Sequence, residues 1–240
     1  MIIDEMEMTT PETRPTAPGP LGVLQQFINS GHLGSDLPVA AETAGVVRER
    51  AEAGEHQATL AREFGLDRKL VSAMGRGAPM FDELADAEAA SEWLREHGLL
   101  DGTGSIDEAG LQRLVAFREL LRVLAIGNAH GETDAAALAQ LTDLARGVPL
   151  VATFEQGASL RMLPAGTGAQ EALGRLLVIL YDAMQDGSWR RLKRCPGQGC
   201  PFTFYDSSRN RTSVWCSMAV CGNRAKVRNY QERNRAARVK

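Results

Sequence analysis

Four cysteines near the end of the chain constrain its fold more than any other feature of the sequence. Cys195 and Cys200 form one pair and Cys216 and Cys221 a second, each pair enclosing four residues, with fifteen residues between the pairs. They are the only cysteines among 240 residues. Two cysteine pairs at short, equal spacing are typical of a metal site. The cysteines therefore predict a compact, metal-held unit near the C-terminus.

The donor set favours one structural Zn²⁺ ion. Zinc takes four tetrahedral ligands and binds thiolate well, and four protein ligands leave no position for water or substrate. All four histidines lie far upstream, at His32, His56, His97 and His130. The cysteines need no outside ligand, and we prefer zinc over an iron–sulfur cluster. A closed site of this kind holds a fold together and does not catalyse a reaction.

Charge divides the chain into two parts of opposite sign. Residues 190–240 hold thirteen Lys and Arg against two acids, a balance of +11, which leaves 14 Lys and Arg against 28 acids in the other 189 residues, a balance of −14. A basic end on an acidic body favours a nucleic-acid partner. The alternative is that the two parts simply attract each other.

The first residues and the hydropathy of the chain predict a cytoplasmic protein. The start at residues 1–5 is acidic and lacks the pattern of a signal peptide, and no run of eighteen apolar residues suggests a membrane helix. In a reducing compartment, paired cysteines are more often metal ligands than disulfides. We therefore expect no membrane association.

Apolar periodicity predicts a mainly α fold with a small β-hairpin (α+β), namely a helical N-terminal domain followed by a treble-clef-like zinc module. Residues 1–19 are rich in Pro and polar residues and are expected to be a disordered tail. Helices are expected from Pro20 and over 39–75, 82–97, 105–125, 134–146 and 169–186, with a hairpin formed by 148–154 and 158–163. Ser105 is expected to begin a capping box.

Two local patterns in the helical part leave alternatives open. Residues 60–72 have the small-residue and glycine spacing of a helix-turn-helix, although two ordinary core helices are preferred. Arg113, Arg118 and Arg122 could line a pocket for an acidic ligand, although a solvated helix face is preferred.

Within the zinc module we expect a strand at 202–205, a turn at 206–210, a returning strand at 212–215 and a helix from Arg224 to about Arg238. The apolar core is small and consists mostly of Phe204, Tyr205 and Trp215, so that zinc supplies much of the folding energy. The helix start is expected to favour the thiolate of Cys221.

Candidate DNA contacts are the polar and basic residues beside the expected turn and at the start of the last helix. Lys and Arg neutralise phosphates, while Asn can bond phosphates or base edges. For Asn223, capping of local backbone is an equally good interpretation. The candidates are Arg209, Asn210, Arg211, Asn223, Arg224, Lys226 and Arg228.

These residues resemble the CGNR zinc-finger family, which is named after the motif at 221–224. The resemblance rests on residues 189–195, 204–210, 215–218 and 221–226. In that family the finger follows a helical domain called ABATE, regarded as a stress-induced transcription regulator. Residues 20–30, 93–99, 148–163 and 186–189 are similar to that domain. The resemblance implies an ABATE-like domain over 20–188 with an insertion at 34–79, and a CGNR finger with a basic C-terminal helix over 189–240.

The resemblance and the charge together favour a DNA-binding transcription regulator, whose helical domain acts as a sensor and dimerisation unit. A homodimer and a small-molecule effector of the helical domain are further expectations. The alternative is a zinc-dependent protein-interaction module that does not touch DNA. An enzyme is not expected, because the sequence shows no catalytic triad order, P-loop or dinucleotide fingerprint.

Overall fold

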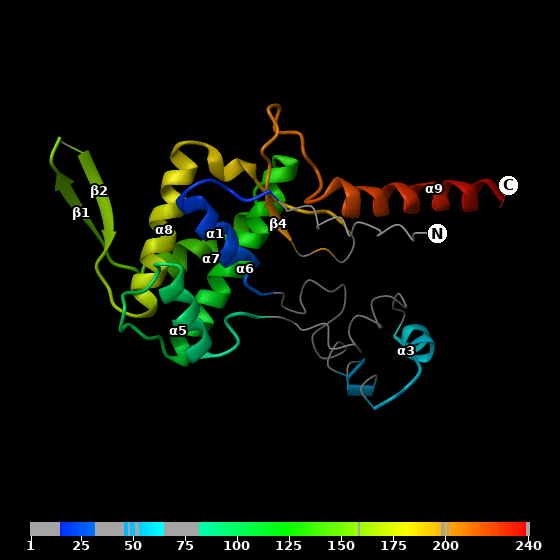
Figure 1. Ribbon diagram of the computed structural model, residues 1–240, viewed down its shortest axis with the longest axis horizontal. Helices are drawn as coiled ribbons and strands as arrows, with labels where there is room; N and C mark the ends of the chain where they lie inside the picture. Colours follow the sequence, from blue (N-terminus) through cyan, green and yellow to red (C-terminus); the bar gives the residue numbers. More distant parts are fainter. Residues whose placement is uncertain are drawn as a thin grey trace, which may run out of the picture.

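The computed structural model describes residues 15–31, 46–47, 49–50, 53–64, 82–157, 159–197, 200 and 202–238. Most of the expected tail, most of the expected insertion at 34–79, and residues 65–72 of the helix-turn-helix candidate lie outside the described residues. Among those described, α3 (Gln57–Glu63) stands apart from the main body (Figure 1). Beside it, Arg50 forms ion pairs with Glu55 and Glu63.

The main body is a bundle of five helices around one hydrophobic core. They are α1 (Pro20–Asn29), α5 (Ala87–Glu96), α6 (Glu108–His130), α7 (Ala135–Ala145) and α8 (Ala169–Gln185). The long helix α6 contacts each of the other four (Figure 1). Its buried face follows the apolar period and includes Leu114, Phe117 and Leu121. The predicted mainly α fold class is confirmed.

Aspartates begin three of these helices. The side chains of Asp86, Asp107 and Asp134 each accept a hydrogen bond from a backbone N–H in the first turn of α5, α6 and α7. This satisfies a donor that the helix leaves unpaired. For α6 we expected Ser105 to be the cap, and this is wrong. The carboxylate of Asp107 is the cap, since it accepts a hydrogen bond from the N–H of Gly110.

The predicted hairpin is confirmed and projects from the bundle. Strand β1 (Leu150–Glu155) pairs antiparallel with β2 (Ser159–Pro164), in a register that runs from Leu150 opposite Pro164 to Glu155 opposite Ser159. Its base lies against α8, while the rest extends outward on the side opposite the C-terminal helix (Figure 1). Phe154 is 83% exposed near its tip.

A second, shorter hairpin differs from the expectation. Strand β4 (Thr203–Tyr205) pairs antiparallel with β3 (Leu192–Arg194), which follows a short 3₁₀ helix η2 (Ser188–Arg191). The expected partner, residues 212–215, forms no strand. The first cysteine pair lies in the turn between β3 and β4, so that the strand before Cys195 becomes the neighbour of β4. The chain then ends in a π-helical turn η3 (Met218–Gly222) and helix α9 (Asn223–Arg238).

The second hairpin is docked on the helical bundle. Trp189 and Leu192 are buried in the main core. The side-chain amide of Asn128 on α6 donates to the carbonyls of both residues, each at 2.9 Å. On α1, Asn29 exchanges two hydrogen bonds with the backbone of Thr203, at 2.8 and 2.9 Å. The hairpin that begins the zinc module therefore packs directly against the helical bundle.

The chain leaves the bundle and returns to it at one point. Gly31 and Asp82 form an isolated β-bridge, and the N–H of Glu83 donates to the carbonyl of Ser30 at 2.7 Å. Ends held this close allow the residues between them to be inserted without disturbing the core.

Two arginines of α6 bind the residues on both sides of this junction. Arg118 is fully buried and donates to both carboxylate oxygens of Asp82, each at 2.6 Å, and to the hydroxyl of Ser30. Arg122 is 1% exposed and donates to the carbonyls of Ile28 and Gly31 at the end of α1. For both arginines the expected solvated helix face is therefore wrong. The alternative, a pocket for an acidic ligand, is also wrong for them, because their guanidinium groups bind other residues of the chain.

Candidate metal centre and basic surface

The four cysteines converge on one point. Their sulfur atoms all lie within 4.8 Å of one another, and the Cys200–Cys216 and Cys216–Cys221 pairs are 3.6 Å apart. Tetrahedral ligands at about 2.3 Å from zinc would place sulfurs about 3.8 Å apart. Cys195, Cys216 and Cys221 are buried and Cys200 is half-buried. The cluster can hold one zinc ion and offers a closed set of thiolate ligands.

The first pair depends on a tight turn. The N–H of Cys195 donates to the carbonyl of Phe202 and that of Cys200 to the carbonyl of Gly197, at 2.9 and 2.8 Å. A Cβ atom on Gly197 would lie 3.2 Å from both Cys200 Cβ and Cys221 Sγ, closer than most real contacts. The turn therefore needs glycine there, because the backbone passes directly over the metal site.

The second pair is shaped by a turn that leads into α9. Ser217 accepts a hydrogen bond from the N–H of Val220 through its hydroxyl, and its carbonyl accepts one from the N–H of Cys221. These bonds wind residues 218–222 into η3 and place Cys221 immediately before α9. The prediction that the last cysteine stands at the helix start is confirmed.

The thiols differ in acidity without the metal. A hydrogen bond from Cys200, together with N–H groups of Cys216 and Gly197, lowers the pKa of Cys195 to about 5 against the opposing effect of burial. Burial first, and then contact with Cys216, raises the pKa of Cys221 to about 11. These neighbours favour the thiolate at Cys195, and stabilisation of the zinc-bound Cys221 thiolate by the start of α9 stays a prediction. Zinc must displace protons from the remaining thiols, so its affinity rises with pH.

A small apolar shell surrounds the sulfurs. Phe204 is buried among them, with Phe202 and Trp215 half-buried at the edge. Tyr205, expected to belong to this shell, packs instead against the main helical core. So small a shell leaves much of the folding energy of the module to the metal.

A buried ion pair, Lys193 with Asp206, organises the loop after β4. Lys193 Nζ donates to Asp206 Oδ2 at 2.7 Å and to the carbonyl of Arg211, also at 2.7 Å. Asp206 accepts further bonds from the N–H and hydroxyl of Ser208 and from the N–H of Ser213. Arg191 donates to the carbonyls of Asp206 and Ser208. The carboxylate therefore holds the loop that was expected to be a hairpin, and Lys193 and Arg191 serve the fold.

The Asp206 carboxylate predicts a loss of stability in acid. Burial alone would raise its pKa, but hydrogen bonds from Lys193 and Ser208 lower the pKa to about 2. A depressed pKa stabilises the folded state above the unfolded value of about 3.9, and this contribution, about 2 kcal/mol, is lost as pH falls toward 2. Asp206→Asn is expected to cost about 3 kcal/mol at pH 7, because it leaves Lys193 buried without its counter-charge.

Urea unfolding of the zinc-loaded protein at several pH values measures both effects. Glu232→Gln is the control, because Glu232 is the other acid of the module and is exposed. An Asp206→Asn variant as stable as the control would contradict the role given to the pair.

The predicted DNA-contact residues gather in two places. Arg209, Asn210 and Arg211 form the exposed tip of the loop. Arg211 has a φ of 56°, the left-handed region, which turns its carbonyl to Lys193. The others lie in the first two turns of α9, where Asn223, Arg224 and Lys226 are exposed and Arg228 is half-buried. Asn223 also caps locally, since its amide donates to the carbonyl of Ala219 at 3.0 Å.

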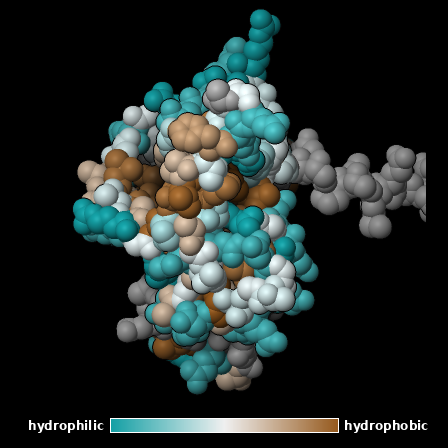
Figure 2. All heavy atoms as spheres, turned by 90° about the vertical axis from the view of Figure 1, so that its left-hand side faces the viewer, coloured by the Kyte–Doolittle hydropathy of each residue, from teal (hydrophilic) through white to brown (hydrophobic). Residues whose placement is uncertain are grey.

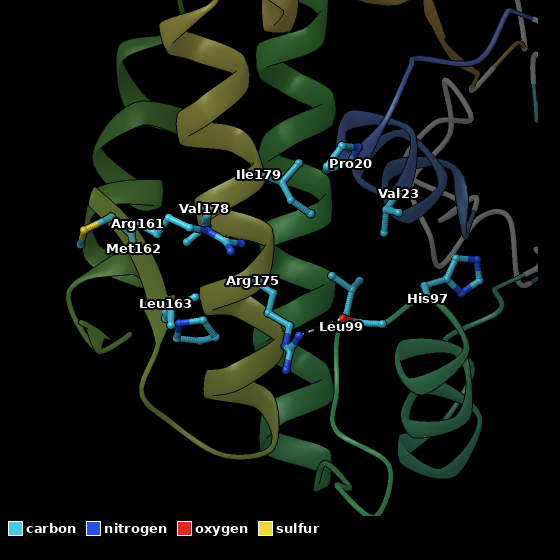
Figure 3. A pocket seen from close by; sticks show the side chains of 12 residues that line it. Pro20, Val23, His97, Leu99, Arg161, Met162, Leu163, Arg175, Val178 and Ile179 are labelled. Atoms are coloured by element: carbon cyan, nitrogen blue, oxygen red, sulfur yellow. Dashed lines mark hydrogen bonds between the residues drawn. The ribbon is translucent and has the colours of Figure 1, made fainter. Parts of the chain in front are cut away.

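A pocket of about 320 Å³ opens in the helical bundle between α1, the end of α5, β2 and α8 (Figure 3). Val23, Leu99, Leu163 and Ile179 give it a largely apolar wall. Both arginines that line it are already paired: Arg175 is bound to Glu171, Asp101 and the carbonyl of Gly98, and Arg161 is bound to Glu155. This pocket lies away from Arg118 and Arg122, whereas Arg113 lines a second, more polar pocket of about 500 Å³ between the start of α6 and the start of α8. A small-molecule effector stays a prediction.

The same side of the molecule carries exposed hydrophobic residues. Figure 2 looks onto the side with β1 and β2 and shows hydrophobic residues gathered across that face. On the hairpin, Phe154, Leu160 and Val151 are 83%, 57% and 47% exposed. The homodimer also stays a prediction. Among the described residues, no helix combines the length and the apolarity needed to cross a membrane.

A closed four-cysteine centre, held on a helical bundle and followed by a basic helix, defines a zinc-finger protein with a helical partner domain. Comparison with known families agrees. The model of the CGNR zinc finger matches residues 191–234, and that of ABATE, described as "putative stress-induced transcription regulator", matches residues 69–185. The chain thus carries a region that matches ABATE followed by one that matches the CGNR zinc finger. None of the curated proteins compared with it matches.

Proposed function

We propose that this protein is a transcription regulator that binds DNA through the surface of its zinc module. The observation that carries this proposal is the concentration of exposed cations on the two segments that leave the zinc centre, the loop at 209–211 and helix α9. Helix α9 follows Cys221 directly, so zinc fixes where its cations stand, and the Lys193–Asp206 pair fixes the loop. The ABATE description as a regulator of transcription supports the same role.

The cations of the zinc module fall into two groups. Lys193 and Arg191 are turned inward, whereas the side chains of Arg209 and Arg224 are exposed. Exposed arginines beside a rigid centre suit phosphate contacts, which give binding that weakens steeply with salt. A protein-interaction module without DNA binding is the alternative, because the same surface could receive an acidic protein.

The test measures the affinity of the zinc-loaded protein for a mixed-sequence 24-bp duplex at increasing salt. Arg209→Ala, Arg224→Ala and Arg211→Asn are each expected to weaken binding and to reduce the slope of log affinity against log salt by about 0.9. Asn replaces Arg211 because it tolerates a positive φ.

Arg146→Ala is the matched control, since Arg146 is an exposed arginine on the cap of α7. The proposal would be contradicted by absence of binding at low salt. It would also be contradicted by an unchanged salt slope in a variant that carries all three changes. A protein partner that stays bound after nuclease treatment, with no duplex binding, would establish the alternative.

A further inference from the structure

Helix α9 has an unusual setting. It runs for 16 residues from Asn223 to Arg238, about 24 Å, and extends away from the bundle (Figure 1). Ala225 in its first turn is buried, whereas Val227 and Tyr230 are 56% and 61% exposed. A helix of this length is marginal in water by itself. Two large apolar side chains on a projecting helix point to a surface that a partner covers.

The residues of α9 form three rows along its length. A central row is spaced by four, three and four residues and so lies on one face; it consists of Asn223, Val227, Tyr230 and Asn234. At 100° per residue, two flanking rows of cations run beside it. One flanking row holds Arg224, Arg228 and Arg235, and the other holds Lys226 and Arg233.

The opposite face of α9 has a different character. Ala225, which is buried, and Glu232, the only acid of the helix, lie on the side away from the central row. Positive charge is therefore placed on both sides of the central row, and the negative charge is placed behind it. A partner that meets the central row would carry two negative borders about one helix diameter apart.

We propose that α9 lies in the major groove of duplex DNA, with the central row facing base edges and each flanking row facing one phosphate backbone. This inference rests on the proposed function and adds which helix recognises the base sequence. An α-helix is 10–12 Å across and the major groove is about 12 Å wide, so the fit is close. In this position Asn234 can bond adenine, and Val227 can contact a thymine methyl group.

Other anionic partners fit this helix less well. The major groove of duplex RNA is too narrow for an α-helix. A membrane-surface helix needs a broad apolar face, whereas the central row of α9 holds two large apolar residues with an asparagine at each end. The two cationic borders match the two strands that flank a groove.

The test selects preferred sequences from a pool of random 20-bp duplexes with the full-length, zinc-loaded protein. Asn234→Ala and Tyr230→Ala are expected to reduce discrimination between the selected sequence and a mixed-sequence duplex about tenfold or more, with an unchanged salt slope. Arg235→Ala is expected to lower affinity equally for all sequences and to reduce the salt slope by about 0.9. Glu232→Gln, on the back of the same helix, should preserve the sequence preference.

Methylation of guanine N7, in the major groove, is expected to block binding to the selected duplex. Salt-dependent binding that is blocked only by adenine N3 methylation, in the minor groove, would overturn the inference and leave the proposed function standing. Binding to vesicles of anionic lipid or to duplex RNA, with no binding to any DNA duplex at low salt, would overturn both.

Discussion

Removal of zinc is expected to unfold α9 and to abolish the proposed DNA binding, while the helical bundle keeps its structure. The module has few buried apolar residues besides the cysteines themselves, with Phe204 the largest. Structural zinc in small fingers supplies on the order of 10 kcal/mol. The β3–β4 hairpin has independent support, because Leu192 lies in the main core and Asn29 holds Thr203. Unfolding is therefore expected to stop at the hairpin.

The measurement compares wild type, wild type with a strong chelator, and Cys221→Ser. Zinc content should fall well below one per chain in the variant, hydrogen exchange should accelerate in α9, and the amides of α6 and α8 should stay protected. Val214→Ser is the control, since Val214 is close to Cys216 in the chain but is 53% exposed. A Cys221→Ser variant with nearly one zinc per chain and a protected α9 would contradict the four-cysteine centre.

Loss of the Asp82 carboxylate should destabilise the bundle by about 3–5 kcal/mol, a large share of the stability of a small domain. Asp82→Ala leaves the guanidinium of Arg118 fully buried with only Ser30 and Glu119 as partners. Most of the cost comes from leaving a buried charge with one weaker ion pair, to Glu119 at 3.2 Å, and not from the lost attraction. The same change also removes the side chain beside the bridge between Gly31 and Asp82.

Urea unfolding of Asp82→Ala, of Arg118→Met and of the double variant measures this coupling. The double variant should be more stable than the sum of the two single losses predicts, because it buries no unpaired charge. Arg113→Ala is the matched control on the same helix, since Arg113 is half-buried and has only a long 3.5 Å bond to Leu144. A loss below about 1 kcal/mol in Asp82→Ala would contradict the role of the pair.

The sequence predicts the metal centre well because cysteine spacing is a local signal. Cys195 and Cys200 enclose a turn, and Cys216 and Cys221 enclose another, so each pair is brought together by a few residues of backbone. The first hairpin and the start of α7 are also local, since they depend on apolar period and on a cap such as Asp134. These features need no knowledge of the rest of the fold.

The buried polar contacts could not be predicted in this way. Arg118 and Arg122 have the spacing of a solvated face, and their partners Asp82 and Ile28 lie 36 and 94 residues away. The only signal is that the two arginines alternate with Phe117 and Leu121 on a face that is otherwise apolar. Burial of a charge is decided by such distant partners, which periodicity does not contain.

The strand that pairs with β4 was predicted wrongly for a similar reason. Residues 192–194 look like part of a basic segment, yet Lys193 is buried against Asp206. The available signal was that Asp206 is one of only two acids among the thirteen cations of residues 190–240. Because Lys193 is buried, fewer of the thirteen cations reach the surface, and most of the exposed ones lie on the loop at 209–211 and on α9.

The central claim is that zinc positions a basic surface that binds DNA. Its most direct test is the affinity for one 24-bp duplex at increasing salt, measured before and after zinc is removed and again after zinc is restored. We predict salt-dependent binding that falls at least a hundredfold without zinc and returns with it. Equal affinity and equal salt slope with and without zinc would contradict the claim.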